Sequence, residues 1–505
     1  MRKPGSRETG RDKVPKNLLF IFSDQHAARV AGCYGDPLAE TPALDRLAAE
    51  GVTFEAAYCP SPICGPSRMS QMTARYPHRT RVWGNEDILS AGIPTFAHSL
   101  GAAGLTPHLV GRLHALGPDQ LLGYTRREIG DHHANWLGVP RVDLGPLEGT
   151  ASPDRRSLLH SGIGQSPYEI KDEDVTEAAL ARLEALAHEV RDGLRDRFSM
   201  TVGFMLPHAP FVARADDFRR FEGRIGLARQ RRPDPDKEHP WLAAWRTACG
   251  VEDVTEAEEI RARTAYYALV ASMDRMIGRI LDQLDALGLA DDTLVVYSSD
   301  HGEQIGAHGH WWKHTFYEDS VRVPMILRWP AGLPRGERRS LVVNLVDLTA
   351  TMLDAMGAPA LPGACGTSFL DAARDPTAPW LDQTFSEYCH GSRFAWGVPG
   401  TSQNRMLRQG RFKLCYYHGH PPQLFDLEED PLEQNDLADN ARYAAVRQSL
   451  TETILSGWNP AEIERQIEDS LPAKALLADW ASATRPSSAH FWNLLPEHCR
   501  LDGVQ

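Results

Sequence analysis

The amino-acid sequence predicts an α/β protein: a large, mostly parallel sheet flanked by helices, with a smaller C-terminal α+β subdomain. Nearly continuous apolar runs of strand length occur at residues 17–24, 200–206 and 293–299, a pattern typical of parallel strands that are covered on both faces. Helical stretches, notably 175–197 and 260–288, lie between such runs. Strands that alternate with helices indicate a parallel sheet packed between helical layers.

The first elements of the chain have recognisable boundaries. The strand at residues 17–24 is followed by a helix whose two ends are marked by residue type. Thr41 is the expected N-cap, Pro42 occupies the first helical position and Gly51 ends the helix, in keeping with the residues that helix termini favour. Two further strands are predicted at residues 105–111 and 323–329.

Ionisable residues stand where three of the predicted strands end. Asp24 closes the first strand, His208 follows the strand at 200–206, and Asp300 and His301 follow the strand at 293–299. In open α/β sheets, ligands bind beyond the carboxyl ends of the strands. These side chains are therefore expected to meet in one site.

The character of the chain changes near residue 385. Short stretches with turns at residues 409–410 and around 419–422 indicate antiparallel strands. We therefore expect an α/β domain over residues 1–384 and a small antiparallel-sheet subdomain with a helical tail over 385–505. The tail carries Trp480, Phe491 and Trp492. Exposed aromatic side chains are expected to be buried against another surface, for example that of a neighbouring subunit.

Composition excludes several classes of function. The 505 residues carry a formal net charge of −13, whereas nucleic-acid binding rests largely on positive charge that neutralises phosphates. No segment approaches the ~18 apolar residues of a membrane span. The basic N-terminus is followed by an apolar run too short for a signal peptide, and the eight cysteines form no CxxC pair. A reducing, cytoplasmic location without membrane or nucleic-acid partners is expected.

One short segment carries most of the functional information. A lone cysteine is usually a small buried hydrophobe, but Cys64 begins the run CGPSRMSQMTAR. This run resembles the C-x-P-S-R-x-x-x-M-T-x-R signature of the type I sulfatases at every defined position. The resemblance implies that a maturation enzyme, which reads C-x-P-x-R, oxidises Cys64 to formylglycine.

The similarity to type I sulfatases, members of the alkaline phosphatase superfamily, extends along nearly the whole chain. FSDQ, GRLHALG, PHAPF and SSDHGEQIGAHGHWWK resemble family motifs and arrive in the family's order, and QGRFKL resembles its closing hairpin. The resemblance implies the alkaline-phosphatase-like sulfatase fold, with the catalytic domain in residues 1–384. It also implies the following functional positions: Asp24, Gln25, Arg112, His114, His208, Asp300, His301 and Lys313.

The implied metal site is rich in oxygen ligands. Asp24, Gln25, Asp300 and His301, together with an oxygen on residue 64 (the modified Cys64), form a hard ligand set that suits Ca²⁺, or Mn²⁺ given one imidazole. Hydrolysis of a sulfate ester needs a nucleophile, a cation that stabilises the sulfate oxygens and an acid for the leaving alcohol.

The resemblance also assigns roles in the reaction. One hydroxyl of the hydrated aldehyde at Cys64 attacks sulfur while Arg68 and the metal hold it, with Asp300 as the expected proton acceptor. His208 and Lys313 stabilise the sulfuryl group and protonate the leaving oxygen, and His114 completes the catalytic set. Arg112 departs from the family's usual lysine at a substrate-binding position, and an arginine offers a planar fork instead of a point charge.

A narrower resemblance points to the choline-sulfatase branch. GNEDILSAGIPTFAHSL, GPDQLLGY, PHAPFVAR and WNPAEIERQI are similar to segments of that branch, which implies a substrate contact for Asn85, a cytoplasmic homo-oligomer and a small anionic substrate. A quaternary ammonium group needs an aromatic or acidic cage. Trp136 lies near the expected place, but DHHANWLG diverges, so no cage is assigned to it, and aryl or other small alkyl sulfates stay open.

Two alternative functions remain. Phosphonate monoester and phosphodiester hydrolases share the implied fold, the formylglycine and the DQ strand. A binding protein without catalysis is the alternative from another class, and it would result if Cys64 stayed unconverted.

Overall fold

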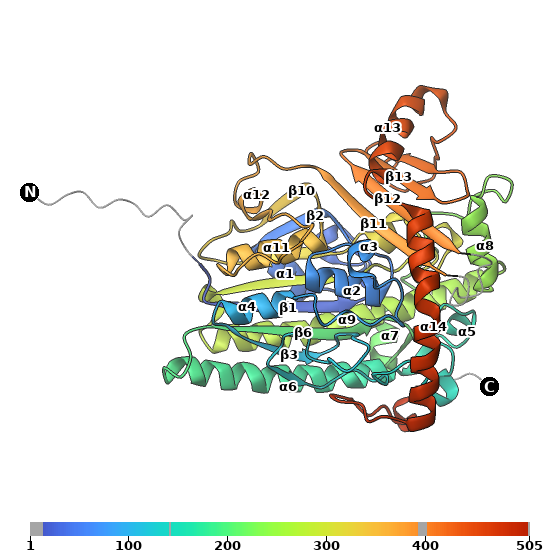
Figure 1. Cartoon of the computed structure of the whole chain (residues 1–505). Coiled ribbons are helices and arrows are strands. Elements are labelled where there is room, and N and C mark those ends of the chain that lie inside the picture. Colours follow the sequence, from blue (N-terminus) through green and yellow to red (C-terminus); the bar gives the residue numbers. More distant parts are fainter. Residues whose placement is uncertain (1–13, 141–142, 392–400, 503–505) are drawn as a thin grey trace, which may run out of the picture.

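The computed structural model describes residues 14–140, 143–391 and 401–502 (Figure 1). Its main feature is an eight-stranded sheet in the order β10-β2-β9-β8-β1-β6-β3-β4. All neighbours are parallel except β9, which runs antiparallel to both β2 and β8. The strands are β1 (Asn17–Asp24), β2 (Val52–Tyr58), β3 (Thr106–Gly111), β4 (Arg126–Glu128), β6 (Phe198–Pro207), β8 (Thr293–Ser299), β9 (Met325–Arg328) and β10 (Glu337–Asn344). The predicted mostly parallel sheet is confirmed.

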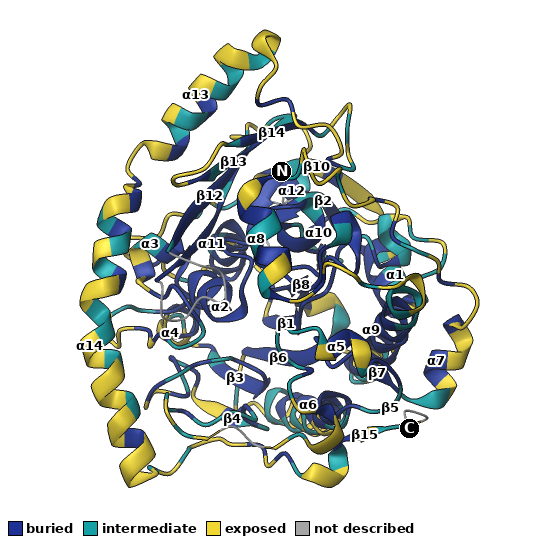
Figure 2. Cartoon of the chain, turned by 90° about the vertical axis from the view of Figure 1, so that its right-hand side faces the viewer, coloured by how far each residue is buried: buried dark blue, intermediate teal, exposed yellow. Residues whose placement is uncertain are grey.

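The middle of this sheet is the core of the molecule. Every residue of β1, β6 and β8 is buried, which explains why these strands are apolar without alternation. Helices α1 (Pro42–Glu50), α6 (Pro167–Arg191) and α9 (Glu256–Ala286) cover one face, and α2 (Cys64–Thr73), α4 (Phe96–Ala102) and α11 (Leu345–Ala355) cover the other (Figure 2). The sheet is thus sandwiched as the alternation of strands and helices predicts.

The N-terminus of α1 is capped differently from the prediction. Pro42 begins this helix and Gly51 follows its end, as expected, but the Thr41 side chain makes no capping hydrogen bond. The carboxylate of Asp274, on α9, accepts hydrogen bonds from the backbone nitrogens of Ala43 and Leu44 at 2.9 Å each. A distant residue therefore satisfies the free N–H groups that a helix N-terminus leaves.

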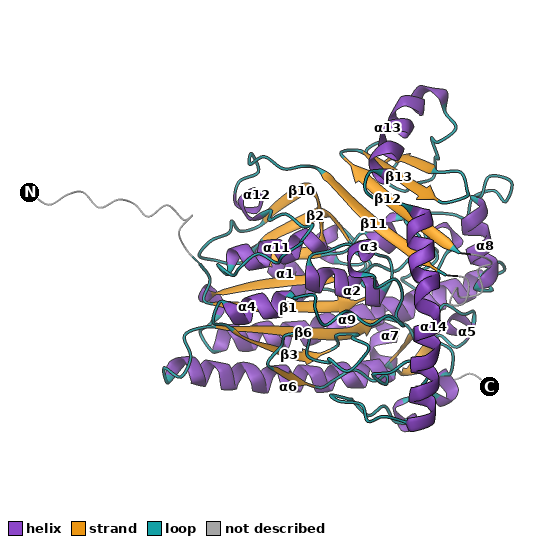
Figure 3. Cartoon of the chain, viewed as in Figure 1, coloured by secondary structure: helices purple, strands orange, loops and turns teal. Residues whose placement is uncertain are grey.

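The C-terminal part of the chain forms a second, antiparallel sheet (Figure 3). Its strands are β11 (Gln383–His390), β12 (Ser402–Gln409), β13 (Phe412–Tyr417) and β14 (Gln423–Asp426), paired in chain order. The predicted turn at residues 409–410 connects β12 to β13. The predicted domain boundary after residue 384 falls within β11 and stays a prediction.

The tail ends in a small third sheet that is separate from the main one. Helix α14 (Pro460–Thr484) runs along one side of the molecule (Figure 1), and β15 (Arg500–Leu501) then pairs with β5 (Gly162–Gln165). Trp492 is buried, and its indole nitrogen donates to Asp174 at 2.8 Å, whereas Trp480 and Phe491 stay 41% and 38% exposed. The chain itself therefore covers Trp492. In the described parts of the chain, no helix has the length and apolar character needed to cross a membrane.

Candidate active site

The site lies where the central strands of the main sheet end. Asp24 is the last residue of β1, Asp300 directly follows β8, and His208 directly follows β6. Cys64 is the first residue of α2, and its side chain is buried against these strand ends. The structure thus brings together residues that are up to 300 − 24 = 276 positions apart in the sequence.

The sulfur of Cys64 lies among polar side chains. It lies 3.1 Å from His301 Nε2, 3.2 Å from Lys313 Nζ and 3.5 Å from Asp24 Oδ1. Asn85 is close as well, because its Oδ1 accepts a hydrogen bond from the backbone nitrogen of Gly65 at 2.8 Å. The side chain at position 64 therefore contacts two predicted metal ligands and a buried lysine.

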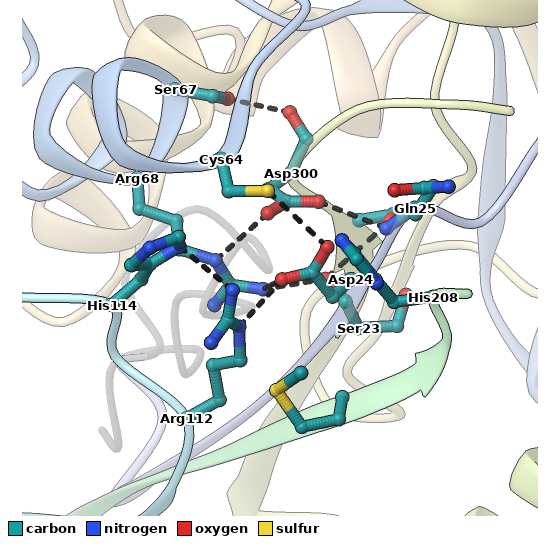
Figure 4. Close-up of polar contacts among 12 residues, drawn as sticks. Ser23, Asp24, Gln25, Cys64, Ser67, Arg68, Arg112, His114, His208 and Asp300 are labelled. Carbon is teal, nitrogen blue, oxygen red and sulfur yellow. Dashed lines mark hydrogen bonds and ion pairs between the residues drawn. The ribbon is translucent and has the colours of Figure 1, made fainter. Parts of the chain in front are cut away.

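Two arginines compensate the two carboxylates of the site (Figure 4). Arg68 Nε donates to Asp300 Oδ2 at 2.8 Å, and Arg68 also donates to Asp24 at 3.3 Å. Arg112 Nε donates to Asp24 Oδ2 at 2.6 Å. Burial opposes the charge on Asp24, but Arg112, His208 and Arg68 together hold the pKa of that carboxyl well below its usual range. Asp24 is therefore ionised.

Arg112 uses the fork shape that a lysine lacks. While Nε binds Asp24, its second terminal nitrogen donates to His114 Nδ1 at 2.7 Å. The remaining terminal nitrogen is buried, has no hydrogen-bond partner among the described residues and lies 3.7 Å from Asp131. A guanidinium can make these contacts at once because its donors point in fixed, different directions.

Hydrogen bonds define the tautomers of the site histidines. The Nδ1 of His301 lies 3.0 Å from the Gly302 carbonyl and the Nδ1 of His208 lies 2.6 Å from the Ala209 carbonyl. A carbonyl only accepts, so both Nδ1 atoms carry the proton. Burial, foremost, lowers the pKa of both rings, so each Nε2 presents a lone pair.

The opposite tautomer holds at His114. Its Nδ1 accepts from Arg112 at 2.7 Å, and burial, with the adjacent guanidinium, lowers the pKa of the ring well below its usual range. The neutral ring therefore carries its proton on Nε2 and can donate a hydrogen bond. In Figure 4, His114 and His208 lie on opposite sides of the group around Asp24.

The residues of the site fit a divalent cation. Asp24, Cys64, Asp300 and His301 are all buried, and each offers a donor atom within 4.8 Å of the others. The lone pair of His301 Nε2 points at the Cys64 sulfur, 3.1 Å away. Carboxylate oxygens and an imidazole nitrogen are both donors that divalent cations bind.

Gln25 and Lys313 are positioned through each other. Lys313 Nζ donates to Gln25 Oε1 at 2.6 Å and to His208 Nε2 at 3.0 Å. The Gln25 amide nitrogen donates to Glu303, which also accepts from the backbone of Trp312 at 2.6 Å. Glu303 lies in the segment SSDHGEQIGAHGHWWK, whose resemblance to the family motif implies no role for it.

Sequence analysis missed a second group of residues beside the site. Asp131 binds Arg127 at 2.7 Å and the backbone nitrogen of His114 at 2.9 Å. His132 and His133 follow it, and the ring of His133 lies 4.9 Å from that of His114. Their segment diverges from the family motifs, so no sequence signal identified them.

Comparisons with known proteins agree with this geometry. A model of the Sulfatase family matches residues 16–358, and a model described as N-sulphoglucosamine sulphohydrolase, C-terminal, matches residues 306–458. The chain is 31% identical to a choline-sulfatase of Rhizobium meliloti (strain 1021), covering 86% of this chain and 85% of the relative. It is 23% identical to an N-acetylglucosamine-6-O-sulfatase of Bacteroides thetaiotaomicron, with coverages of 93% and 89%.

A solved structure shares the fold. The phosphonate monoester hydrolase of Agrobacterium radiobacter superposes with a TM-score of 0.70 at 24% identity, covering 88% of this chain and 95% of that chain. The architecture is that of the alkaline-phosphatase-like sulfatases. Because the family model spans more than half of the sequence and the choline-sulfatase exceeds 30% identity, the chain belongs to the sulfatase family of sulfuric ester hydrolases.

Proposed function

We propose that this sulfatase hydrolyses a sulfate ester of a small alcohol or phenol, with Cys64 converted to formylglycine and one divalent cation bound beside it. The observation that carries this proposal is the position of Cys64: it begins α2 inside the sulfatase signature and faces His301, Asp24 and Lys313 at 3.1–3.5 Å. Hydrated formylglycine supplies two hydroxyls on one carbon, one as nucleophile and one for release of the bound sulfate.

The chain provides the cation ligands and their support. Asp24, Asp300, His301 and residue 64 would hold the ion, whose positive charge stabilises the non-bridging oxygens of the sulfate. Arg68 orients the Asp300 carboxylate through its 2.8 Å contact. Ca²⁺ is the expected ion, and Mn²⁺ is the alternative. Gln25 positions Lys313 by accepting its hydrogen bond. The side-chain oxygen of Gln25 is also the further metal ligand that the sequence predicts.

Residues on the other side of position 64 bind the sulfate and handle protons. The buried Arg112 nitrogen without a hydrogen-bond partner among the described residues and the Nε2–H of His114 are donors suited to sulfate oxygens. Lys313 donates to His208 Nε2 at 3.0 Å and lies 3.2 Å from the Cys64 sulfur. This pair can therefore deliver a proton to the leaving oxygen.

The hydrogen bonds of the two carboxylates favour Asp24 over Asp300 as the proposed proton acceptor. Asp300 was expected in that role, but its oxygens accept from Arg68 at 2.8 Å and from the backbone nitrogens of Gln25 and His301 at 3.0 and 2.9 Å. Asp24 Oδ1 lies 3.5 Å from the Cys64 side chain. Asp24 is therefore the better-placed acceptor.

Several sulfate esters are candidate substrates. The name of the Rhizobium relative suggests choline sulfate and that of the Bacteroides relative suggests an amino-sugar sulfate. The fold shared with a phosphonate monoester hydrolase supports the alternative of a phosphonate monoester or phosphodiester. A formylglycine-generating maturation enzyme as partner, a cytoplasmic location and a homo-oligomer belong to the same proposal.

The test compares two leaving-group-matched esters. The full chain, produced together with a formylglycine-generating enzyme, is assayed with p-nitrophenyl sulfate and p-nitrophenyl phenylphosphonate. We expect a higher kcat/KM for the sulfate and loss of activity in Cys64→Ala. Preference for the phosphonate would favour the alternative function. A binding protein without catalysis would hydrolyse neither ester in its mature form.

A further inference from the structure

A row of rings connects His208 to His114, which lie on opposite sides of the group around Asp24 (Figure 4). Centroid separations along the row are 5.8 Å from His208 to Tyr168, 4.8 Å to His132, 5.7 Å to His133 and 4.9 Å to His114. His208 accepts a hydrogen bond from Lys313, the proposed proton donor to the leaving oxygen, and His114 is a proposed sulfate ligand. The rings between them therefore border the site, next to the proposed sulfate ligand His114.

His133 presents an unsatisfied acceptor in this row. Its Nδ1 lies 3.2 Å from the Ala134 carbonyl and so carries a proton. Burial, first, lowers the pKa of the ring and favours its neutral form; Asp131 opposes this shift and Arg112 adds to it. His133 Nε2 is buried and has no hydrogen-bond partner among the described residues. A buried acceptor of this kind is costly unless something donates to it.

The surroundings of His133 do not favour a cation. The neighbouring carboxylate of Asp131 is compensated by Arg127 at 2.7 Å and by Arg112 at 3.7 Å. Trp136, a few residues on, packs edge-to-face against Trp480 with ring centroids 4.9 Å apart. A quaternary ammonium group needs an aromatic cage or a free negative charge beside it. The negative charge of Asp131 is already compensated by the two arginines, so it does not meet this need.

We propose that His133 Nε2 accepts a hydrogen bond from a hydroxyl of the leaving alcohol, which makes an uncharged polyhydroxylated alcohol, such as a sugar, the leaving group. The inference rests on the proposed sulfate-ester hydrolysis and narrows it. Choline sulfate has no O–H or N–H donor, so it would leave this acceptor unpaired. Sites built to bind a hydroxyl reject analogues that lack it much more strongly than apolar pockets reject extra groups.

The C-terminal tail holds the loop that carries His133. The backbone nitrogen of Trp492 donates to the Asp131 carbonyl at 2.9 Å, and Asn135 donates to Ser488 at 3.2 Å and to Ala489 at 3.3 Å. These contacts fix the backbone on both sides of His133. A fixed acceptor discriminates better than a mobile one, because its geometry is set before the substrate arrives.

The test uses two matched esters that differ in their hydroxyl groups, and choline sulfate as a third substrate. The mature full chain is assayed with D-glucose 6-sulfate and with cyclohexylmethyl sulfate, its analogue without ring oxygen or hydroxyls, and with choline sulfate. Wild-type kcat/KM for the glucose ester is expected to exceed that for the other two by about tenfold or more. His133→Phe removes the acceptor and should erase most of this ratio, whereas His133→Asn retains an acceptor oxygen and should restore part of it.

A matched control and the outcomes complete the design. His188→Phe makes the same exchange at an exposed position of α6 and should leave the ratio unchanged. Equal rates for the two matched esters, a preference for choline sulfate, or an unaltered ratio in folded His133→Phe would overturn the inference alone. Failure to hydrolyse any sulfate ester, p-nitrophenyl sulfate included, would instead refute the proposed function and this inference with it.

Discussion

Replacing Arg112 with lysine tests whether the fork shape of this side chain matters. The guanidinium binds Asp24 at 2.6 Å and His114 at 2.7 Å in different directions. The single ammonium group of a lysine can remain with Asp24 but cannot also donate to His114. His114 Nδ1 would then lose its donor, and with it the tautomer that places the proton on Nε2.

The size of the effect follows from the lost contact. Leaving a buried acceptor without its hydrogen bond costs about 1–3 kcal/mol. Since about 1.4 kcal/mol corresponds to a tenfold change in rate, kcat/KM for p-nitrophenyl sulfate should fall roughly 10- to 100-fold in Arg112→Lys. Arg126→Lys is the matched control, because Arg126 is exposed on β4 and binds Glu128 in a surface pair, which is worth little.

A double-mutant cycle shows whether the loss passes through His114. In a His114→Ala background the partner is absent, so Arg112→Lys should lower kcat/KM by a much smaller factor than in the wild type. Equal losses in both backgrounds would refute the reasoning, and so would an Arg112→Lys enzyme within twofold of the wild type.

Further variants address the proton donor, the tail and the core. Lys313→Met should lower kcat by about 10²–10⁴ while the circular dichroism spectrum is retained; a loss in KM alone would contradict the assigned role. In Gly130→Ala the new Cβ would stand 1.1 Å from the His490 carbonyl oxygen, so the melting temperature should fall, whereas Gly101→Ala, with open space around it, should not lower it. Burial raises the pKa of Asp274 from 3.8 to about 7, so the folded protein binds that proton more tightly than the unfolded chain. The free energy of unfolding of the wild type should then lose a contribution as pH rises from about 4 to 7. Urea unfolding at pH 5 and pH 8 should therefore show a smaller decrease in this free energy for Asp274→Asn than for the wild type.

Structural features that depend on a short, continuous stretch of residues could be predicted from the sequence. Uninterrupted apolar runs that end in Asp24 or precede Asp300 identify buried strands and their polar ends at once. The signature around Cys64 is a single continuous segment, so it is readable without the fold. The structure places these residues side by side, because parallel strands deliver their carboxyl ends to one edge of the sheet.

Features that depend on distant packing could not be predicted. The apolar pattern of β9 does not encode strand direction, so its antiparallel course was not expected. The N-terminal cap of α1 is the side chain of Asp274, 231 positions beyond Ala43. No local sequence motif predicts this contact. His133 gains its place beside His114 through a loop held by the tail, a contact that only the folded chain creates.

The central claim is that active protein carries formylglycine at position 64, and mass spectrometry tests it most directly. Trypsin is expected to release residues 47–68, a peptide that also contains Cys59 as an internal unconverted thiol. After alkylation of an active preparation, the account predicts one alkylated cysteine, Cys59, and the mass of an aldehyde in place of the thiol at position 64. Two alkylated cysteines in fully active protein would contradict it.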